Sequence, residues 1–207
     1  KTASATLYLG TDSEIVIPSE IHDIPVVSLE KNFRCLIIDN CEIESITIPG
    51  TIKTIPDECF TEFNGLKKLV LNDGIEVIGN RAFMDCSQLS EINIPDSVTT
   101  INQNAFHECT SLKNAKLSSS LEAINENTFS DCSALTEVIV PASVGSIGNS
   151  AFAKCTNLTK VGLTEGLTSI GIRAFESCTS LNDIVLTTMA TIFRSNQCPS
   201  SGTDYYR

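Results

Sequence analysis

Tryptophan is absent from this chain of 207 residues, and Phe supplies nine of its twelve aromatic residues. Basic residues are also few, with 14 Lys and Arg against 25 Asp and Glu and a net charge of −11. Recognition of a phosphate backbone requires clustered Lys and Arg, so we expect no nucleic-acid partner. No apolar run is long enough to span a bilayer, and we expect no membrane insertion.

The residues of catalytic and metal sites are equally sparse. Only two His residues occur, His22 and His107. No phosphate-binding loop, Gly-x-Ser-x-Gly motif or His-Glu-x-x-His motif is present. The nine Cys residues include no closely spaced pair of the kind that zinc sites use. We therefore expect no enzyme activity, no metal and no cofactor.

The chain does contain a sequence repeat with a constant step. This step equals the distance along the chain from Phe60 to Phe83. A fixed period of this size is typical of a solenoid, in which each unit buries its apolar face only against its neighbours. The period indicates a long binding surface rather than a single catalytic cleft. It is marked by Phe60, Phe83, Phe106, Phe129, Phe152 and Phe175.

Each repeat contains a Leu-x-x-Ile-x-Ile pattern, as at Leu89, Ile92 and Ile94. The alternation predicts a short half-buried strand, and strands repeated at a fixed period stack in parallel about 4.8 Å apart. Two aliphatic columns follow the strand, and we expect both inside the coil. They are Ile52, Ile75, Val98, Leu121, Val144 and Leu167, and Ile55, Ile78, Ile101, Ile124, Ile147 and Ile170.

A column of small or turn-forming residues comes next, and we interpret it as a corner in a left-handed or capping conformation. We expect a short helical turn after it, which carries Ala105, Phe106 and Cys109 inward on one face. Where the strand ends, Pro alternates with other residues from one repeat to the next. This alternation predicts a unit of two repeats, in which one strand ends at Pro and the other at a turn that contains Gly. The corner column is Pro56, Gly79, Asn102, Asn125, Gly148 and Gly171.

We divide the chain into three parts. Residues 1–42 form an irregular N-terminal cap with a degenerate repeat, in which Ile15-Val-Ile17 echoes the strand. Residues 43–186 hold six repeats of the constant length and a partial seventh. Residues 187–207 are the remnant of a C-terminal cap or a tail. Irregular ends are expected because terminal repeats have a neighbour on one side only.

The repeated phrase resembles the BspA-like (Treponema-type) leucine-rich repeat family, the bacterial surface-antigen type. The family hallmark stands here as Ile94-Pro-Asp-Ser-Val98, followed by Ile101, Ala105-Phe106 and Cys109. The resemblance implies an α/β fold, a right-handed arc or horseshoe with a parallel β-sheet on the concave face and short helical turns on the convex face. It also implies a secreted or cell-surface bacterial protein that takes part in adhesion, and the family has no catalytic residues to carry over.

Two further columns invite a chemical interpretation. Cys86, Cys109, Cys132, Cys155 and Cys178 occupy one position of successive repeats, and we interpret them as buried thiols that act as small apolar side chains. A disulfide between Cys35 and Cys41 stays an alternative to free thiols, and the odd number leaves at least one thiol free or intermolecular. The column that precedes the Cys residues is interpreted as a solvated face, although its four carboxylates in line, those of Glu62, Asp85, Glu108 and Asp131, could attract calcium.

The outward positions of the strands are the candidate partner-binding residues. The first column alternates in charge, and we expect cross-strand pairs that contribute only about 0.2–1 kcal/mol each. The expected pairs are Lys68–Glu91, Glu137–Lys160 and Lys160–Asp183. The second column includes apolar residues that would lie exposed as contact points. The candidates are Lys68, Val70, Glu91, Asn93, Asn114, Lys116, Glu137, Ile139, Lys160, Asp183 and Val185.

Size limits how tightly such a face can bind. A sheet face on the order of 500 Å² is smaller than the roughly 800 Å² per partner of a standard interface. We therefore expect a monomer that acts as a weak or multivalent binder of an extracellular or host surface protein. The alternative is a structural spacer that displays neighbouring domains and has no ligand of its own.

Overall fold

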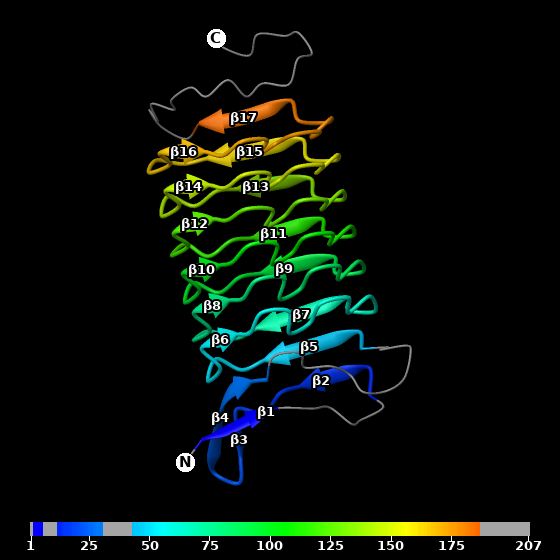
Figure 1. Ribbon diagram of the computed structural model, residues 1–207, viewed down its shortest axis with the longest axis vertical. Helices are drawn as coiled ribbons and strands as arrows, with labels where there is room; N and C mark the ends of the chain where they lie inside the picture. Colours follow the sequence, from blue (N-terminus) through cyan, green and yellow to red (C-terminus); the bar gives the residue numbers. More distant parts are fainter. Residues whose placement is uncertain (1, 6–11, 31–42, 187–207) are drawn as a thin grey trace.

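The computed structural model describes residues 2–5, 12–30 and 43–186. These residues form an elongated stack of coils, with the N-terminal strands at the lower end of Figure 1. Within them, each complete coil contributes one strand to each of two parallel sheets. One sequence repeat is therefore one turn of a β-solenoid.

The larger sheet has eight parallel strands in the order β17-β15-β13-β11-β9-β7-β5-β2. Its register follows the repeat, since Asn114 opposes Glu91 of the coil before. Alternate side chains point into the core, where Ile46 and Val138 are buried, which confirms the predicted alternation. The strands are β2 (Glu14–Val16), β5 (Ser45–Ile48), β7 (Lys68–Leu71), β9 (Glu91–Asn93), β11 (Asn114–Lys116), β13 (Glu137–Ile139), β15 (Lys160–Leu163) and β17 (Asp183–Leu186).

A second parallel sheet of six two-residue strands was not predicted. It forms where the second aliphatic column runs, so that Ile55, Ile78 and Ile101 point inward as expected while their backbones pair between coils. The strands are β6 (Thr54–Ile55), β8 (Val77–Ile78), β10 (Thr100–Ile101), β12 (Ala123–Ile124), β14 (Ser146–Ile147) and β16 (Ser169–Ile170).

The N-terminal part adds a small sheet of β1 (Ala3–Ala5), β4 (Ile24–Leu29) and β3 (Glu20–Ile21). The turn between β3 and β4 places His22 and Asp23 at positive φ, as the tight turns of antiparallel hairpins require. β2 joins the large sheet with Ile15 opposite Ile46, although the step between these two residues is longer than the constant repeat. The degenerate strand motif predicted at Ile15 is therefore a strand of the large sheet.

The Phe residues form a continuous stack through the core. Successive rings from Phe60 to Phe175 lie 5.3–5.6 Å apart between centroids and within 11° of parallel. From Phe60 to Phe152 the side chains have no exposed surface. In the first full coil Phe63 takes the Cys position and packs edge-on against Phe60, with the centroids 5.5 Å apart. The ring spacing is close to the strand spacing, so one Phe per coil fills the core without a gap.

The predicted helical turns are wrong, because the described residues contain no helix. Two residues of each convex segment have positive φ, such as Arg81 (52°) and Asp85 (55°), which a right-handed helix does not allow. The amides of Phe83 and Asp85 donate to the carbonyls of Ala105 and His107 in the next coil, at 2.9 and 2.8 Å. Those amides are thereby unavailable to a helical hydrogen-bond ladder. The expected inward placement of Ala105, however, is confirmed.

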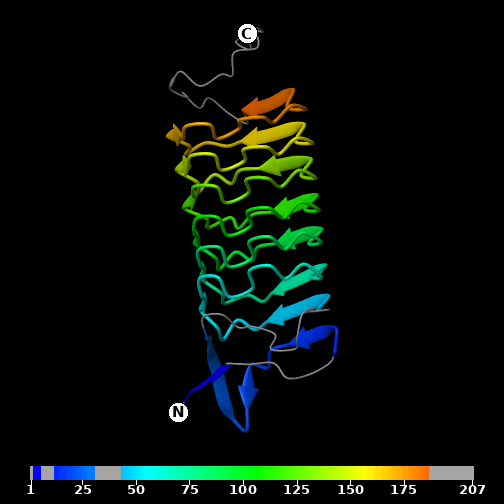
Figure 2. The same ribbon diagram turned by 45° about the vertical axis from the view of Figure 1, so that its right-hand side comes forward.

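The stack is nearly straight in both views, rather than bent into the predicted horseshoe (Figures 1 and 2). Packed helices lie about 8–10 Å apart, whereas paired strands lie about 4.8 Å apart. A repeat with helices on one side and strands on the other must therefore curve. Here both sides of each coil bond directly to the next backbone, so the two sides have similar spacing and little curvature results.

Of the two conformations expected for the corner column, left-handed or capping, the left-handed one is wrong, because no residue of this column has a positive φ. Among the described glycines only Gly74 and Gly166 have positive φ, both 109°, and they form the turns of the two repeats in which a Gly turn was predicted. Gly148 is required for a different reason, because a Cβ there would lie 2.6 Å from the backbone nitrogen of Glu126 in the preceding coil. Backbones of successive coils thus approach closely at the corner.

The Cys column is a ladder of free thiols, buried from Cys86 to Cys155 and half-buried at Cys178. Each thiol donates a hydrogen bond to the Phe carbonyl of the preceding coil, at 3.1–3.3 Å, a role that the sequence did not predict. Burial raises the pKa of the Cys86 thiol from 9.0 to about 12, and also raises the pKa of Cys109. The proposed Cys35–Cys41 disulfide lies outside the described residues, as does Cys198.

Truncation of a central ring tests the Phe stack. We expect Phe106→Ala to lower the free energy of unfolding by about 3–5 kcal/mol, because a buried ring is lost from between two neighbours. Phe175→Ala is the matched control and should have a smaller effect, since Phe175 is only partly buried. Urea denaturation measures both. A loss below about 1 kcal/mol at Phe106, or equal losses at the two positions, would contradict the stack.

The left-handed positions predict a stabilising substitution. Ser150 has a φ of 51°, and the equivalent positions of two preceding coils hold Asn104 and Asn127. Asn tolerates this conformation better than Ser, so Ser150→Asn should raise the free energy of unfolding by about 0.5–1 kcal/mol. The control, Ser169→Asn, changes an exposed residue of β16 and should give no gain. Equal effects of the two substitutions in thermal denaturation would rule out the conformational explanation.

The thiol ladder predicts a loss of stability in alkali. Unfolded thiols ionise near pH 9, whereas the buried ones stay protonated to higher pH. The contribution of the buried, protonated thiols to the free energy of unfolding is therefore complete below pH 9 and is lost as the pH rises through their folded-state pKa. Cys109→Ser keeps a hydrogen-bond donor but removes one ionisable thiol. It should therefore reduce the slope of the free energy of unfolding against pH by up to about 1.4 kcal/mol per pH unit. Denaturation at several pH values measures the slope, and the wild-type slope in this variant would refute the linkage.

Candidate functional site

The predicted partner-binding residues all lie on the outward side of the eight-stranded sheet, which we call the strand face. The pleat of each strand sends two residues outward and places the aliphatic side chain between them in the core. Because the stack is nearly straight, this face is flat rather than concave. Exposed on it are Lys68, Glu91, Asn93, Asn114, Lys116, Glu137, Ile139 and Asp183, while Val70, Lys160 and Val185 are half-buried.

The charged column of the strand face is only partly neutralised. Lys160 and Glu137 form the predicted cross-strand ion pair, with Nζ 3.1 Å from Oε1. Lys68 stands opposite Glu91, and Lys160 opposite Asp183. In the described part of the chain, neither of these two predicted pairs comes within ion-pair distance. Charge therefore stays available to a partner on this face.

The exposed apolar side chains of the strand face lie toward its two ends, whereas Val70, on β7 between them, is half-buried. Ile139 is 60% exposed, and its Cγ1 would lie 3.5 Å from a Cβ added at Gly162, so Ile139 leans across the Gly of the next coil. Val185 follows in the same column. At the other end Val16 is 69% exposed and opposes Thr47.

Val16 is a strand-face residue that the sequence did not identify. The longer step between the first two coils concealed its register, although the echo of the strand motif at Ile15 was the available signal. Glu14 joins the charged column in the same way, since it pairs in register with Ser45. The strand face therefore begins one coil earlier than predicted.

The middle of the strand face is polar. Asn93 and Lys116 oppose each other in register. Asp96 follows the preceding strand, and its Oδ1 accepts a hydrogen bond from the amide of Ser119 at 2.9 Å. That amide, the Ser119 side chain and the charge of Lys116 hold the pKa of Asp96 below its usual value. Lys116 is thus exposed near a carboxylate that stays ionised.

The remaining candidates for chemistry lie on the convex side. His107 contacts Glu108, with Nε2 3.1 Å from Oε1, and its Nδ1 lies 3.2 Å from the backbone carbonyl of Ser130. The Ser130 hydroxyl bonds instead to Asp131, so no nucleophile faces the imidazole. Asp131, from the acidic column, is paired with Lys154 at 3.2 Å. Within residues 2–5, 12–30 and 43–186, no three His, Cys, Asp or Glu side chains converge as metal ligands would.

The same ranges contain no helix with the length and apolar character needed to cross a membrane. The strand face brings exposed apolar side chains, and charges without an ion-pair partner among the described residues, onto one row of neighbouring strands.

Comparison with known proteins agrees with the fold. The chain is similar to a leucine-rich repeat protein of T. pallidum, with 27% identity and a TM-score of 0.62 over 86% of this chain and 82% of that one. A leucine-rich cell surface protein from Faecalibacterium prausnitzii is 24% identical, with a TM-score of 0.56 over 90% and 73% of the two chains. The pneumococcal vaccine antigen PcpA is 23% identical, with a TM-score of 0.54 over 87% and 63%.

A comparison with curated proteins gives no significant match. The sequence pattern of one repeat family, the BspA type leucine-rich repeat region, matches in six copies over residues 37–158 and 76–198. Together these matches cover most of the chain, including all of the complete coils, and they confirm the resemblance found in the repeated phrase. The chain belongs to the BspA-type leucine-rich repeat family.

Proposed function

We propose that this chain is a non-catalytic protein-interaction module of an exported bacterial surface protein, and that it mediates adhesion through the strand face. The observation that carries the proposal is the division of roles within each repeat. The recurring side chains, such as Phe106 and Cys109, point inward and build the core. The residues that differ from coil to coil point outward on one continuous plane.

The strand face offers two kinds of contact to a protein partner. Ile139 and Val16 are exposed aliphatic side chains near opposite ends of the sheet. Lys116, Asn93 and Lys68 lie between them and supply charge and hydrogen-bonding groups. Apolar contacts supported by polar groups around them are the arrangement that protein interfaces use.

The size of the strand face favours modest affinity. Eight strands of three or four residues, about 4.8 Å apart, give a face on the order of 400 Å². A standard interface buries roughly 800 Å² on each partner. Neither Trp nor Tyr lies in the outward columns, so the aromatic anchors of tight interfaces are missing. We therefore infer a weak contact that gains strength when several copies act together on a cell surface.

Surface localisation is supported by the relatives, one of which is described as a cell surface protein and another as a vaccine antigen. The main alternative is a structural spacer, which the straight rod shape and the Glu137–Lys160 ion pair favour. A spacer would hold neighbouring domains apart and would have no ligand of its own. The enzyme alternative draws no support from the described residues, where no cluster could hold a metal ion and the Ser130 hydroxyl, near His107, bonds to Asp131.

The test is binding of the chain to a panel of purified plasma and extracellular-matrix proteins, with the chain displayed in many copies on beads. Lys116→Glu combined with Ile139→Glu should weaken every detected contact about tenfold or more, because it reverses one charge and places another on an apolar contact point. The matched control, Lys53→Glu with Ile172→Glu, makes the same chemical changes away from the strand face, at residues that are also exposed.

The outcomes separate the alternatives. Loss of binding in the strand-face variant but not in the control supports the proposal. Equal binding by the two variants would place the contact elsewhere on the solenoid. Absence of any contact for the multivalent wild-type chain would favour the spacer.

A further inference from the structure

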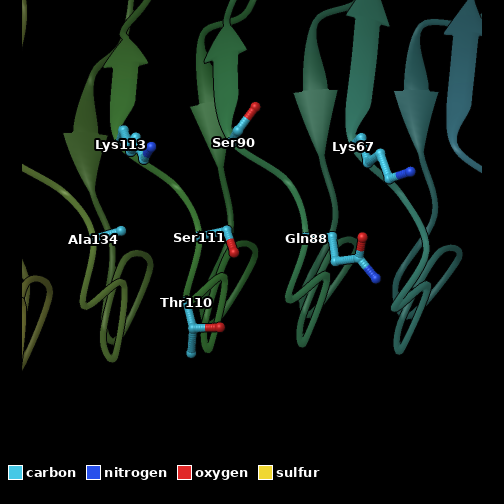
Figure 3. A pocket seen from close by; sticks show the side chains of 7 residues that line it. All are labelled: Lys67, Gln88, Ser90, Thr110, Ser111, Lys113 and Ala134. Atoms are coloured by element: carbon cyan, nitrogen blue, oxygen red, sulfur yellow. The ribbon is translucent and has the colours of Figure 1, made fainter.

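A shallow groove of about 500 Å³ runs along the solenoid beside the strand face. One row of its lining comes from the same position in three successive repeats, Lys67, Ser90 and Lys113, which immediately precede β7, β9 and β11. Figure 3 shows this row facing a second row, formed by Gln88 and Ser111 on the loops that lead into the strands. The groove therefore follows the long axis and crosses several coils.

The groove is positively charged on a strongly acidic chain. None of its seven lining residues is a carboxylate, whereas the chain as a whole has a net charge of −11. Lys67 also contacts Glu44, in the coil on the N-terminal side. Lys113 makes no ion pair with any residue in the described part of the chain. A local excess of positive charge of this kind attracts an anionic ligand.

The polar groups of the groove are available for hydrogen bonds. The side chains of Gln88, Ser90 and Ser111 form no hydrogen bond with another described residue. By contrast, the hydroxyl groups of Thr136 and Thr159, which continue the first row, donate to backbone carbonyls at 3.4 and 3.0 Å. Free donors and acceptors thus concentrate where the two lysines are.

The shape and lining favour a sugar polymer over a protein segment. The only apolar side chain in the lining is that of Ala134, so a peptide would find no pocket for the anchors that protein contacts need. Lys67 and Lys113 lie two coils apart, or about 10 Å along the stack. A chain of sugars with an acid group on every second unit presents negative charges at a comparable spacing, with hydroxyl groups between them.

We propose that this groove binds an acidic polysaccharide. Lys67 and Lys113 hold the carboxylate or sulfate groups of alternate sugars. Ser90, Ser111 and Gln88 bond to the sugar hydroxyls between these groups. The site is separate from the strand face, so the proposal goes beyond the protein-interaction role and does not depend on it.

Calorimetric titration with a chondroitin sulfate oligosaccharide tests the groove, with neutral dextran and poly-glutamate as comparison ligands. The whole chain should bind the oligosaccharide and neither comparison ligand. Lys67→Gln with Lys113→Gln should weaken binding by at least about tenfold, since two charge-assisted contacts are lost. The control, Lys53→Gln with Lys154→Gln, removes the same charge at residues outside the groove and should stay within about twofold of the wild type.

Three results would overturn the proposal: no binding of the oligosaccharide, an equal loss in the control, or equally tight binding of poly-glutamate. Equal binding of poly-glutamate would mean that the groove attracts any polyanion, including an acidic peptide. The strand-face variant, Lys116→Glu with Ile139→Glu, should bind the oligosaccharide as the wild type does. Failure of the groove and failure of the strand face are therefore distinguished in one set of proteins.

Discussion

Hydrogen bonding between the backbones of successive coils, on both sides of the solenoid, is the constraint on which the rest of the structure depends. It fixes the length of the repeat, because an insertion would shift every later coil out of register. It requires Gly at the corner of some coils, since a Cβ at Gly148 would meet the preceding backbone at 2.6 Å. It also brings the Phe rings to 5.3–5.6 Å and each thiol within reach of a Phe carbonyl.

This constraint divides the residues of each repeat into inward positions that build the scaffold and outward positions that are available to a partner. Inward positions are fixed by the need to stack on identical neighbours, so they carry little information about a ligand. Outward positions are released from that need. They vary on the strand face, where Ile139 is exposed beside an ion pair, and along the groove, whose lining contains Lys67 and Lys113 and no carboxylate. Both surfaces run along the axis, so both suit extended or multivalent partners.

The sequence predicted the period, the parallel sheet and the inward columns, because a side chain repeated at a fixed step must occupy the same environment in every coil. It did not predict the convex turns. Ala105, Phe106 and Cys109 have a spacing that fits a helix face, and a non-helical turn buries the same residues. The sign of φ is not evident from residue type either, since charged residues such as Arg81 and Lys154 adopt the left-handed conformation. Val16 was missed because the first step is longer than the rest.

Site-resolved amide hydrogen exchange tests the central claim most directly. The amides of Phe83, Phe106 and Phe129 donate across to the next coil at 2.8–3.0 Å on the side where helical turns had been expected. If coils are joined on both sides, these amides open with the same free energy as the amides of the neighbouring β7, β9 and β11 strands. Fast exchange of the Phe amides beside protected strand amides would show that only one side is joined, and would contradict the account.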